Sequence, residues 1–220
     1  MTKAEYIDFI RNSLPQVDKT SKYHHEQVAA AINVAVNTIF YDMYKQQPKS
    51  FKKSMERYTS LTSLSVILTG ISKPRYNSAI TVDVVDLPRK TGGIIEIVAK
   101  AGAGFPITTT TTRFVPVSTM EGEQFYGAEC SLPDTIIGFS YSGVAAGSAG
   151  QTNIEFWNMD AATAVGGVYA RLIRQFMSYG LTENVILPYG RDQQIIELVR
   201  QFLGAIPPKD LLNDNADGRN

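Results

Sequence analysis

The hydrophobic period of this chain changes twice, and this change limits the folds that it can adopt. Apolar residues recur at helical spacing in residues 3–14 and 25–45, whereas residues 59–157 hold many short strand-like runs separated by glycine and proline. Helical spacing then returns in residues 158–206. The pattern predicts an α+β fold, with N- and C-terminal helices packed as a helical bundle and an inserted antiparallel β-sandwich or barrel domain.

The predicted domain limits follow these changes of period. Residues 1–58 and 158–206 are expected to form one discontinuous helical docking domain, because neither pair of helices covers its apolar surface alone. Residues 59–157 are expected to form the β-rich inserted domain, and residues 207–220 a C-terminal arm.

Two helices are expected in the C-terminal part. The first begins near Asp160, and the glycines at 166 and 167 within it each cost about 1 kcal/mol relative to alanine, which suggests close packing against another backbone. The second runs from Asp192 to Leu203. The apolar residues that suggest the first helix are Val165, Val168, Leu172, Phe176 and Met177.

The helix expected at residues 25–45 carries no charge between Glu26 and Asp42. A helix that faces solvent normally has a charged outer side. We therefore expect this helix to be central in the fold and also to lie against another chain. The subunit-interface residues predicted on it are Asn33, Val34 and Asn37.

A basic stretch follows that helix, where five basic residues and Glu56 give a net charge of +4. One interpretation is a solvated linker. The other is a surface that contacts DNA phosphates or an acidic neighbouring ring, and such a contact would weaken with salt. The candidate partner or DNA contacts are Lys45, Lys49, Lys52, Lys53 and Arg57.

The arm expected at residues 207–220 leaves the last helix through Pro207 and Pro208, which favour an extended chain. Leu211 and Leu212 are its large apolar residues, and they stand among aspartates and asparagines. A strap across an adjacent subunit would use such a pair, so both are predicted interface residues; a frayed terminus is the alternative interpretation.

Residue types that carry catalysis or bind metal are scarce. His24 and His25 are adjacent, so they cannot form the i, i+4 zinc pair of a helix, and Cys130 is the single cysteine. We expect a protein that is not an enzyme and that holds no metal or cofactor. A hydrolase with an unrecognised site remains the enzymatic alternative.

The charge balance and the N-terminus restrict the partners. Lys+Arg and Asp+Glu are 21 each, so the formal net charge is zero, which argues against a dedicated nucleic-acid binder and opposes self-association little. The N-terminus carries acids where a signal peptide is apolar, and no uncharged apolar run approaches the roughly 20 residues of a membrane span. A soluble protein with no membrane partner is expected.

Two blocks of spaced residues carry a resemblance. They are Tyr6-Ile7, Leu14, Asp18, Lys22-Tyr23-His24 and Phe40-Tyr41-Asp42 in the N-terminal part, and Leu187-Pro188-Tyr189-Gly190-Arg191-Asp192 and Leu212-Asn213-Asp214 in the C-terminal part. These blocks resemble virion neck proteins of crAss-like and related Bacteroidetes tailed phages, and they cover under half of the chain.

The resemblance implies a structural virion protein, namely a subunit of a homo-oligomeric ring in the neck or tail that connects the portal to the tail around the DNA channel. It implies twelve-fold symmetry to match the portal. The implied partners are further copies of the chain, the portal, other neck and tail ring proteins and, transiently, the passing genomic DNA. The implied location is the virion, after synthesis in the cytoplasm of the host bacterium.

A second function class rests on the β-rich domain. A carbohydrate-binding or capsid or tail decoration module would place exposed aromatic side chains beside acids and amides. The aromatic candidates in the insert are Tyr76, Phe125, Tyr126, Tyr141 and Trp157.

Overall fold

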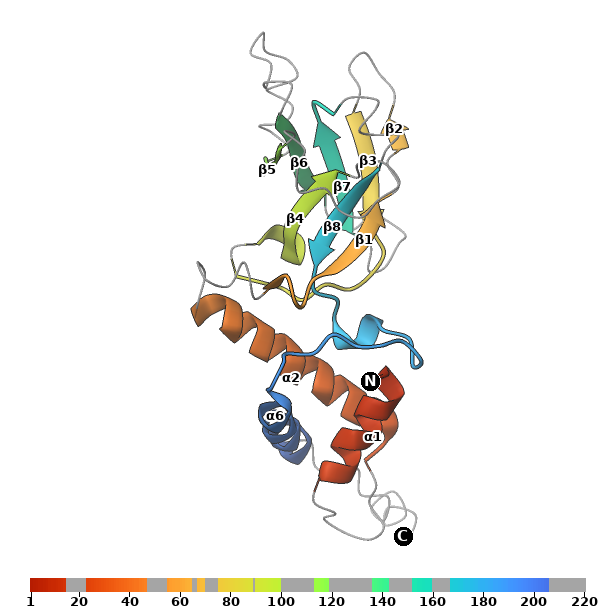
Figure 1. Ribbon diagram of the computed structural model, residues 1–220, viewed down its shortest axis with the longest axis vertical. Coiled ribbons are helices and arrows are strands. Elements are labelled where there is room, and N and C mark those ends of the chain that lie inside the picture. The colour runs from red at the N-terminus through yellow and green to blue at the C-terminus, as the bar shows by residue number, and fades with distance from the viewer. Residues whose placement is uncertain are drawn as a thin grey trace, which may run out of the picture. The chain divides into compact units, whose positions relative to one another are not determined.

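The fold is α+β. The computed structural model describes residues 1–14, 23–46, 55–64, 67–69, 75–88, 90–99, 113–118, 136–142, 152–159 and 167–205, and these hold three α-helices and two β-sheets (Figure 1). The chain divides into two compact units. The helical unit comprises Met1–Gln47 with Gln175–Asn220, and the β unit comprises Pro48–Arg174. The β unit is therefore longer at both ends than the insert expected from the sequence.

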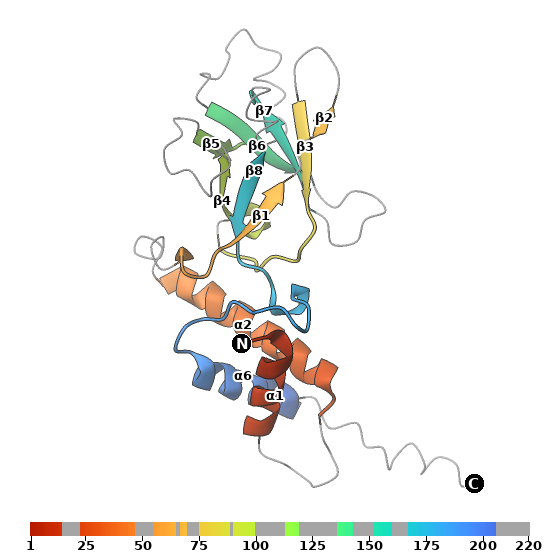
Figure 2. The same cartoon turned by 45° about the vertical axis from the view of Figure 1, so that its right-hand side comes forward.

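The helical unit contains α1 (Lys3–Ser13), α2 (His25–Gln46) and α6 (Asp192–Ala205), with the short 3-10 helix η2 (Phe176–Ser178). α2 packs against α1, α6 and η2, as Figure 2 shows for the labelled helices. The helices expected at 3–14, 25–45 and 192–203 are confirmed. The fully buried apolar side chains include Tyr6, Ile7, Ile10, Val28, Ile32, Ala35, Ile39, Phe40, Phe176, Ile195 and Val199.

Side-chain hydrogen bonds cap the starts of the first two helices, and at α1 the bonds are reciprocal. The hydroxyl of Thr2 accepts from the N–H of Glu5, whose carboxylate accepts from the N–H of Thr2 at 2.8 Å. At the start of α2 the N–H of His24 donates to the side chain of Gln27, and the carbonyl of His24 accepts from Val28. These bonds satisfy donors that a helix start would otherwise leave unpaired.

The N-terminal residues are bonded to the segment that follows η2. Thr2 and Asn184 form an antiparallel bridge, and the N–H groups of Lys3 and Ala4 donate to the carbonyls of Glu183 and Leu181 at 2.9 and 3.0 Å. The start of α1 is therefore held against a segment about 180 residues later in the chain.

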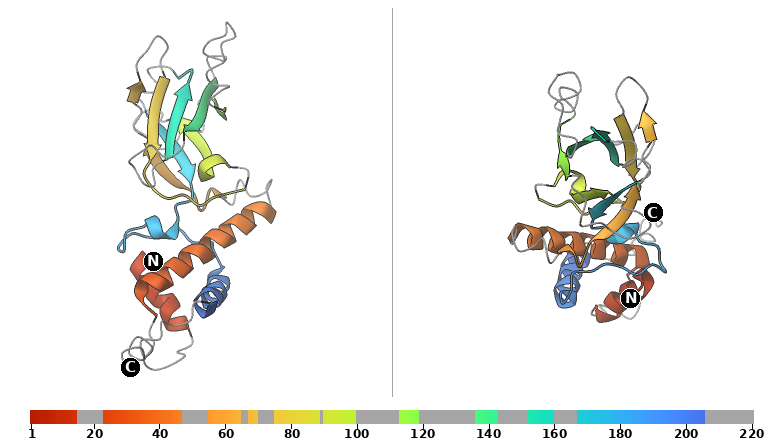
Figure 3. Two further views of the ribbon diagram at one scale, coloured as in Figure 1. Left: turned by 180° about the vertical axis from the view of Figure 1, so that it is seen from behind. Right: turned by 45° about the horizontal axis from the view of Figure 1, so that its top comes forward.

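The β unit contains two sheets. The first has the antiparallel order β1 (Ser60–Leu64), β8 (Val168–Leu172), β4 (Ile94–Ala99), and Figure 3 shows its strands from two further sides. The second has the order β2 (Ile67–Thr69), β3 (Arg75–Ile80), β7 (Thr152–Trp157), β6 (Ile136–Ser142), β5 (Arg113–Pro116). The short 3-10 helix η1 (Thr91–Gly93) precedes β4. The described strands form no closed barrel.

One strand pair departs from the expected antiparallel pattern. β5 and β6 are parallel, with Arg113 opposite Ile136 and Phe114 opposite Ile137. The 19 residues between these two strands are long enough for the crossover that a parallel pair needs. The five-stranded sheet is therefore mixed.

The apolar core of the β unit draws on both sheets. Leu64, Ile97 and Ala170 come from the three-stranded sheet, and Phe139 and Phe156 come from the five-stranded sheet. All of them belong to one cluster of buried side chains. Burial of this cluster is the main source of stability for a unit of this kind.

The expectation of a helix that starts near Asp160 is wrong for residues 168–172, which the structure describes. Residues 168–172 form β8, whose side chains alternate between buried and half-buried, and β8 pairs with β1 on one side and β4 on the other. Val168 and Leu172 fit the helical spacing, but with Ala170 they also fit the two-residue period of a strand. Gly167, at φ 86°, precedes the strand and is not within a helix.

The pairing of β1 with β8 brings the two ends of the β unit together. Ser60 lies opposite Leu172 and Leu64 opposite Val168, so the entering and leaving strands run side by side in opposite directions. A unit whose ends are neighbours can be inserted into another without separating the two parts of its host. This register explains how one helical unit is built from both ends of the chain.

Candidate interaction surface

The exposed side of α2 is the candidate surface. Ala30, Val34 and Tyr41 are exposed on it, with Val34 at 45%, and they recur at helical intervals along one side of the helix. At 1.5 Å per residue the span from Ala30 to Tyr41 is about 17 Å. We call this set, with the half-buried Asn37 and Thr38, the α2 face.

The other sides of α2 are buried. Val28, Ile32, Ala35 and Ile39 have essentially no exposed surface, because α1, α6 and η2 pack on them. The expectation of a central helix is therefore confirmed. The absence of charge between Glu26 and Asp42 follows from burial on most sides, but burial does not explain it on the α2 face.

The two asparagines predicted as interface residues differ in their hydrogen bonds within the chain. Asn33 donates from its side chain to Gln175 at 3.3 Å and accepts from the N–H of Met177 at 3.1 Å, so it fixes η2 within its own chain. Asn37 is half-buried, and its side-chain oxygen receives no hydrogen bond within the described residues. That oxygen has essentially no exposed surface, so it is not an acceptor that a partner on the α2 face can reach.

The basic stretch is described only at its two ends. Lys45 is exposed in the last turn of α2, and Arg57 is exposed in the β unit. Lys49, Lys52 and Lys53 lie outside the described residues, as do the predicted arm residues Leu211 and Leu212. Of these candidates the structure therefore describes only Lys45, in the helical unit, and Arg57, in the β unit.

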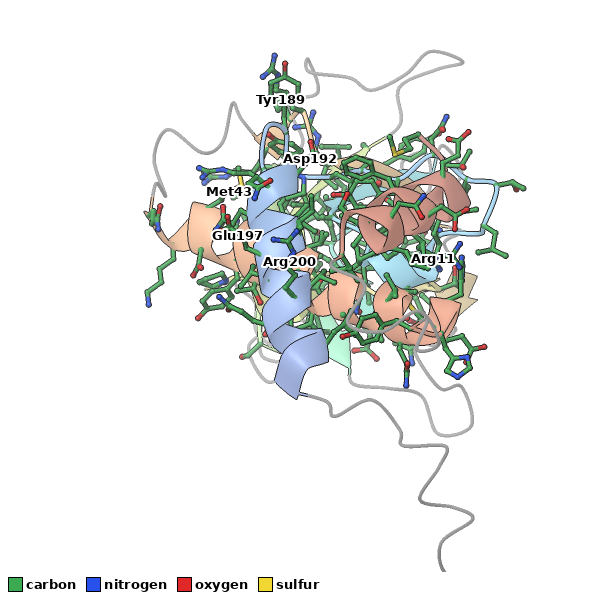
Figure 4. The ribbon with its side chains drawn as sticks, turned by 90° about the horizontal axis from the view of Figure 1, so that it is seen from below. Arg11, Met43, Tyr189, Asp192, Glu197 and Arg200 are labelled. Carbon is green, nitrogen blue, oxygen red and sulfur yellow. The ribbon has the colours of Figure 1, made fainter. Side chains whose placement is uncertain are left out.

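The reasoning from sequence missed a protruding turn before α6. The N–H of Arg191 donates to the carbonyl of Pro188 at 3.2 Å, and Gly190 has φ 70°, which is the pattern of a type II turn. Pro188 is buried, whereas Tyr189 at the second position of the turn is 80% exposed. Figure 4 shows Tyr189 projecting beyond the start of α6 at Asp192.

Two buried polar side chains of α1 bond to the C-terminal part of the helical unit, Tyr6 to the start of α6 and Lys3 to the segment around η2. The hydroxyl of Tyr6 donates to the carboxylate of Asp192 at 3.1 Å, and burial together with that carboxylate raises the pKa of Tyr6 well above its usual value. The ammonium of Lys3 donates to the carbonyls of Met177 and Tyr179 at 2.9 and 2.8 Å. Burial lowers the pKa of Lys3, partly opposed by the carboxylate of Glu183.

Tyr6 makes the helical unit sensitive to alkaline pH. Above pH 10 the unfolded chain ionises this phenol while the folded chain keeps it protonated, so stability falls by about 1.4 kcal/mol per pH unit. Lys3 acts in the opposite sense below its ordinary pKa of 10.5, because the unfolded state binds more protons there. We expect Tyr6→Phe to reduce the loss above pH 10 in urea unfolding monitored by far-UV circular dichroism. Burial also raises the pKa of Tyr141 in the β unit, so part of the loss should remain. An unchanged alkaline slope in Tyr6→Phe would contradict this role.

The aromatic residues considered for a carbohydrate-binding function belong to the β unit, whereas the α2 face belongs to the helical unit. Tyr76 and Trp157 are buried, Tyr141 is half-buried, and Phe125 and Tyr126 lie outside the described residues. The described tyrosine and tryptophan side chains of the insert therefore do not form an exposed platform for sugar rings. Among the described residues no group of three or more His, Cys, Asp and Glu side chains is placed to hold a metal ion.

Comparison with known proteins adds no assignment. No protein-family model matches the sequence, and no curated protein sequence matches it significantly. In the described part of the chain, every helix is too short or too polar to cross a membrane.

Proposed function

We propose that this chain is a structural virion protein, a subunit of a homo-oligomeric ring in the neck or tail of a tailed phage. The ring connects the portal to the tail around the DNA channel and performs no catalysis. The observation that carries the proposal is the α2 face, an exposed helix side with Val34 and Tyr41 in solvent and no charge between Glu26 and Asp42.

The physical argument starts from the cost of that face in an isolated chain. A charged outer side would keep the helix soluble, and here uncharged and apolar groups occupy it instead. Contact with another copy would cover Val34 and Tyr41, which are exposed in the isolated chain. When two different surfaces of identical copies meet, each copy is rotated relative to the one before it. The copies close into a ring if a whole number of these rotations makes one full turn.

The partners and location follow from the resemblance to phage neck proteins. The ring is twelve-fold, stacks on the portal and on other neck or tail ring proteins, and is made in the host bacterial cytoplasm. Lys45, Lys49, Lys52, Lys53 and Arg57 contact an acidic neighbouring ring or passing DNA, and residues 207–220 strap an adjacent subunit through Leu211 and Leu212. If a variant with charge reversal at the lysines entered phage particles as often as the wild-type protein, the role of the basic residues would be contradicted. If a variant without residues 209–220 did so, the role of the strap would be contradicted.

The finer architecture belongs to the same proposal. The helical unit is a bundle that docks on neighbouring rings, and the two sheets of the β unit pack as a sandwich. The core that draws side chains from both sheets supports the sandwich, and the β1–β8 pairing supports its insertion into the bundle.

The proposal is tested by placing a charge on the α2 face. We expect the wild-type protein to form closed rings, and Val34→Asp to shift it to monomers, because a carboxylate buried in an apolar contact loses its hydration. Native mass spectrometry over a concentration series measures the shift. The matched control is Gln201→Asp, on the exposed side of α6, which should assemble like the wild type. Intact rings of Val34→Asp would show that the α2 face is not an interface.

A further inference from the structure

The turn that carries Tyr189 has the features of one half of a protein contact. Pro188 anchors it in the interior, the hydrogen bond from Arg191 to Pro188 closes it, and the N–H of Ile195 bonds to Arg191, so the turn continues directly into α6. Tyr189 is the most exposed of the large apolar and aromatic side chains of the described residues. A fixed, protruding tyrosine loses little conformational freedom on binding, and tyrosine and arginine are enriched among residues that dominate binding energy.

We infer that Tyr189 of one copy docks on the α2 face of the next copy, and that Arg191 of the first copy pairs with Glu26 of the second. This inference rests on the proposed ring function and names the two surfaces that meet in each subunit contact. The same chain carries both surfaces, one protruding and aromatic, the other uncharged and long enough to accept a ring.

Charge complementarity favours this pairing and its direction. Glu26 is exposed one helical turn before Ala30 and in line with Ala30, Val34 and Tyr41, so it marks one end of the α2 face. Arg191 is exposed two residues after Tyr189, and its guanidinium donates to the side chain of Gln194 at 3.3 Å, a long hydrogen bond on the surface. The proposed contact places the ring of Tyr189 on Ala30 and Val34 and pairs Arg191 with Glu26 at the end of the α2 face.

In the proposed ring the contact is heterologous: the turn of each copy meets the α2 face of the next copy, without the reciprocal contact that a two-fold dimer would add. Each subunit then uses its turn toward one neighbour and its α2 face toward the other, which leaves both surfaces filled in a closed ring. An isologous contact would stop at a dimer. The pairing therefore explains why the two surfaces coexist on one unit.

The test combines truncation with charge exchange in the full-length chain. Tyr189→Ala should raise the concentration at which half of the protein is assembled by roughly thirty-fold. Its control is Leu181→Ala, another exposed apolar side chain of the helical unit, which should leave that concentration unchanged. Arg191→Glu and Glu26→Arg should each raise it about tenfold through like-charge contacts.

Mixing the two charge variants decides whether the pair lies between copies. A 1:1 mixture of Arg191→Glu and Glu26→Arg should regain ring formation, because every contact then joins opposite charges when the variants alternate. Native mass spectrometry of differently tagged variants should show equal numbers of each in one ring. A mixture that assembles no better than the separate variants would overturn the pairing. Wild-type rings with normal assembly of Tyr189→Ala would overturn the docking of the turn alone, whereas absence of wild-type rings would overturn the proposed function itself.

Discussion

Replacing Lys3 with methionine should destabilise the helical unit by about 2–4 kcal/mol. The side chain of Lys3 is only 7% exposed, and its ammonium bonds to the carbonyls of Met177 and Tyr179 while lying 5.7 Å from the centre of the Phe176 ring. Methionine keeps most of the volume but donates no hydrogen bond, so the buried bond to Tyr179 and the partly buried bond to Met177 are both lost. Relief from burying a charge offsets part of the loss.

Chemical denaturation followed by circular dichroism measures this effect at neutral pH. The matched control is Lys45→Met, because Lys45 is an exposed lysine of the same unit, and we expect its stability to lie within about 0.5 kcal/mol of the wild type. Equal stability of the two variants would contradict the clamp formed by Lys3. Lys3 and Asn33 both bond to the segment around η2, and Asn33 lies on α2. Lys3→Met should therefore also weaken assembly.

Replacing Gly93 with alanine should destabilise the β unit by about 2–5 kcal/mol. Gly93 has φ 69°, a left-handed conformation that side chains disfavour, and a Cβ atom there would collide with the carbonyl oxygen of Val85 and with the side chain of Val84. The carbonyl belongs to a segment whose own N–H is bonded to Ile173, so it cannot move away freely.

Gly167→Ala separates the two causes. Gly167 also has positive φ, at 86°, but a Cβ atom there would meet no atom within 4 Å. It should therefore cost only the backbone strain, about 1 kcal/mol. The difference between the two midpoints of urea unfolding, followed by tryptophan fluorescence of the buried Trp157, measures the collision. Equal losses in both variants would contradict the close approach of Gly93 to Val85.

The elements that were predicted correctly have one period and clear ends. α1 and α6 follow the 3.6-residue spacing of Ile7, Ile10, Ile195 and Val199, and α2 follows it over its whole length. β8 was mistaken for a helix because Val168 and Leu172 satisfy both periods, and only the pairing with β1 and β4 selects the strand. The parallel β5–β6 pair depends on long-range register, which local spacing does not contain.

The candidate surface was predictable only in part. The lack of charge in α2 predicted Val34 as an interface residue, because packing within the chain does not explain why an exposed helix side has no charge. Asn33 was expected at the interface, yet it bonds to Gln175 and Met177, contacts from residues more than 140 positions away. The turn at Tyr189 had a local signal in Pro188 and Gly190, but the exposure of the tyrosine depends on the burial of its neighbours.

Electron microscopy of the purified wild-type protein, alone and together with the phage portal ring that the proposal names as its neighbour, tests the central claim most directly. The account predicts class averages of closed rings with a central channel, twelve-fold when stacked on the portal, in which α2 of each subunit lies at the contact with its neighbour. Monomers that persist at high concentration and fail to assemble on the portal would contradict it.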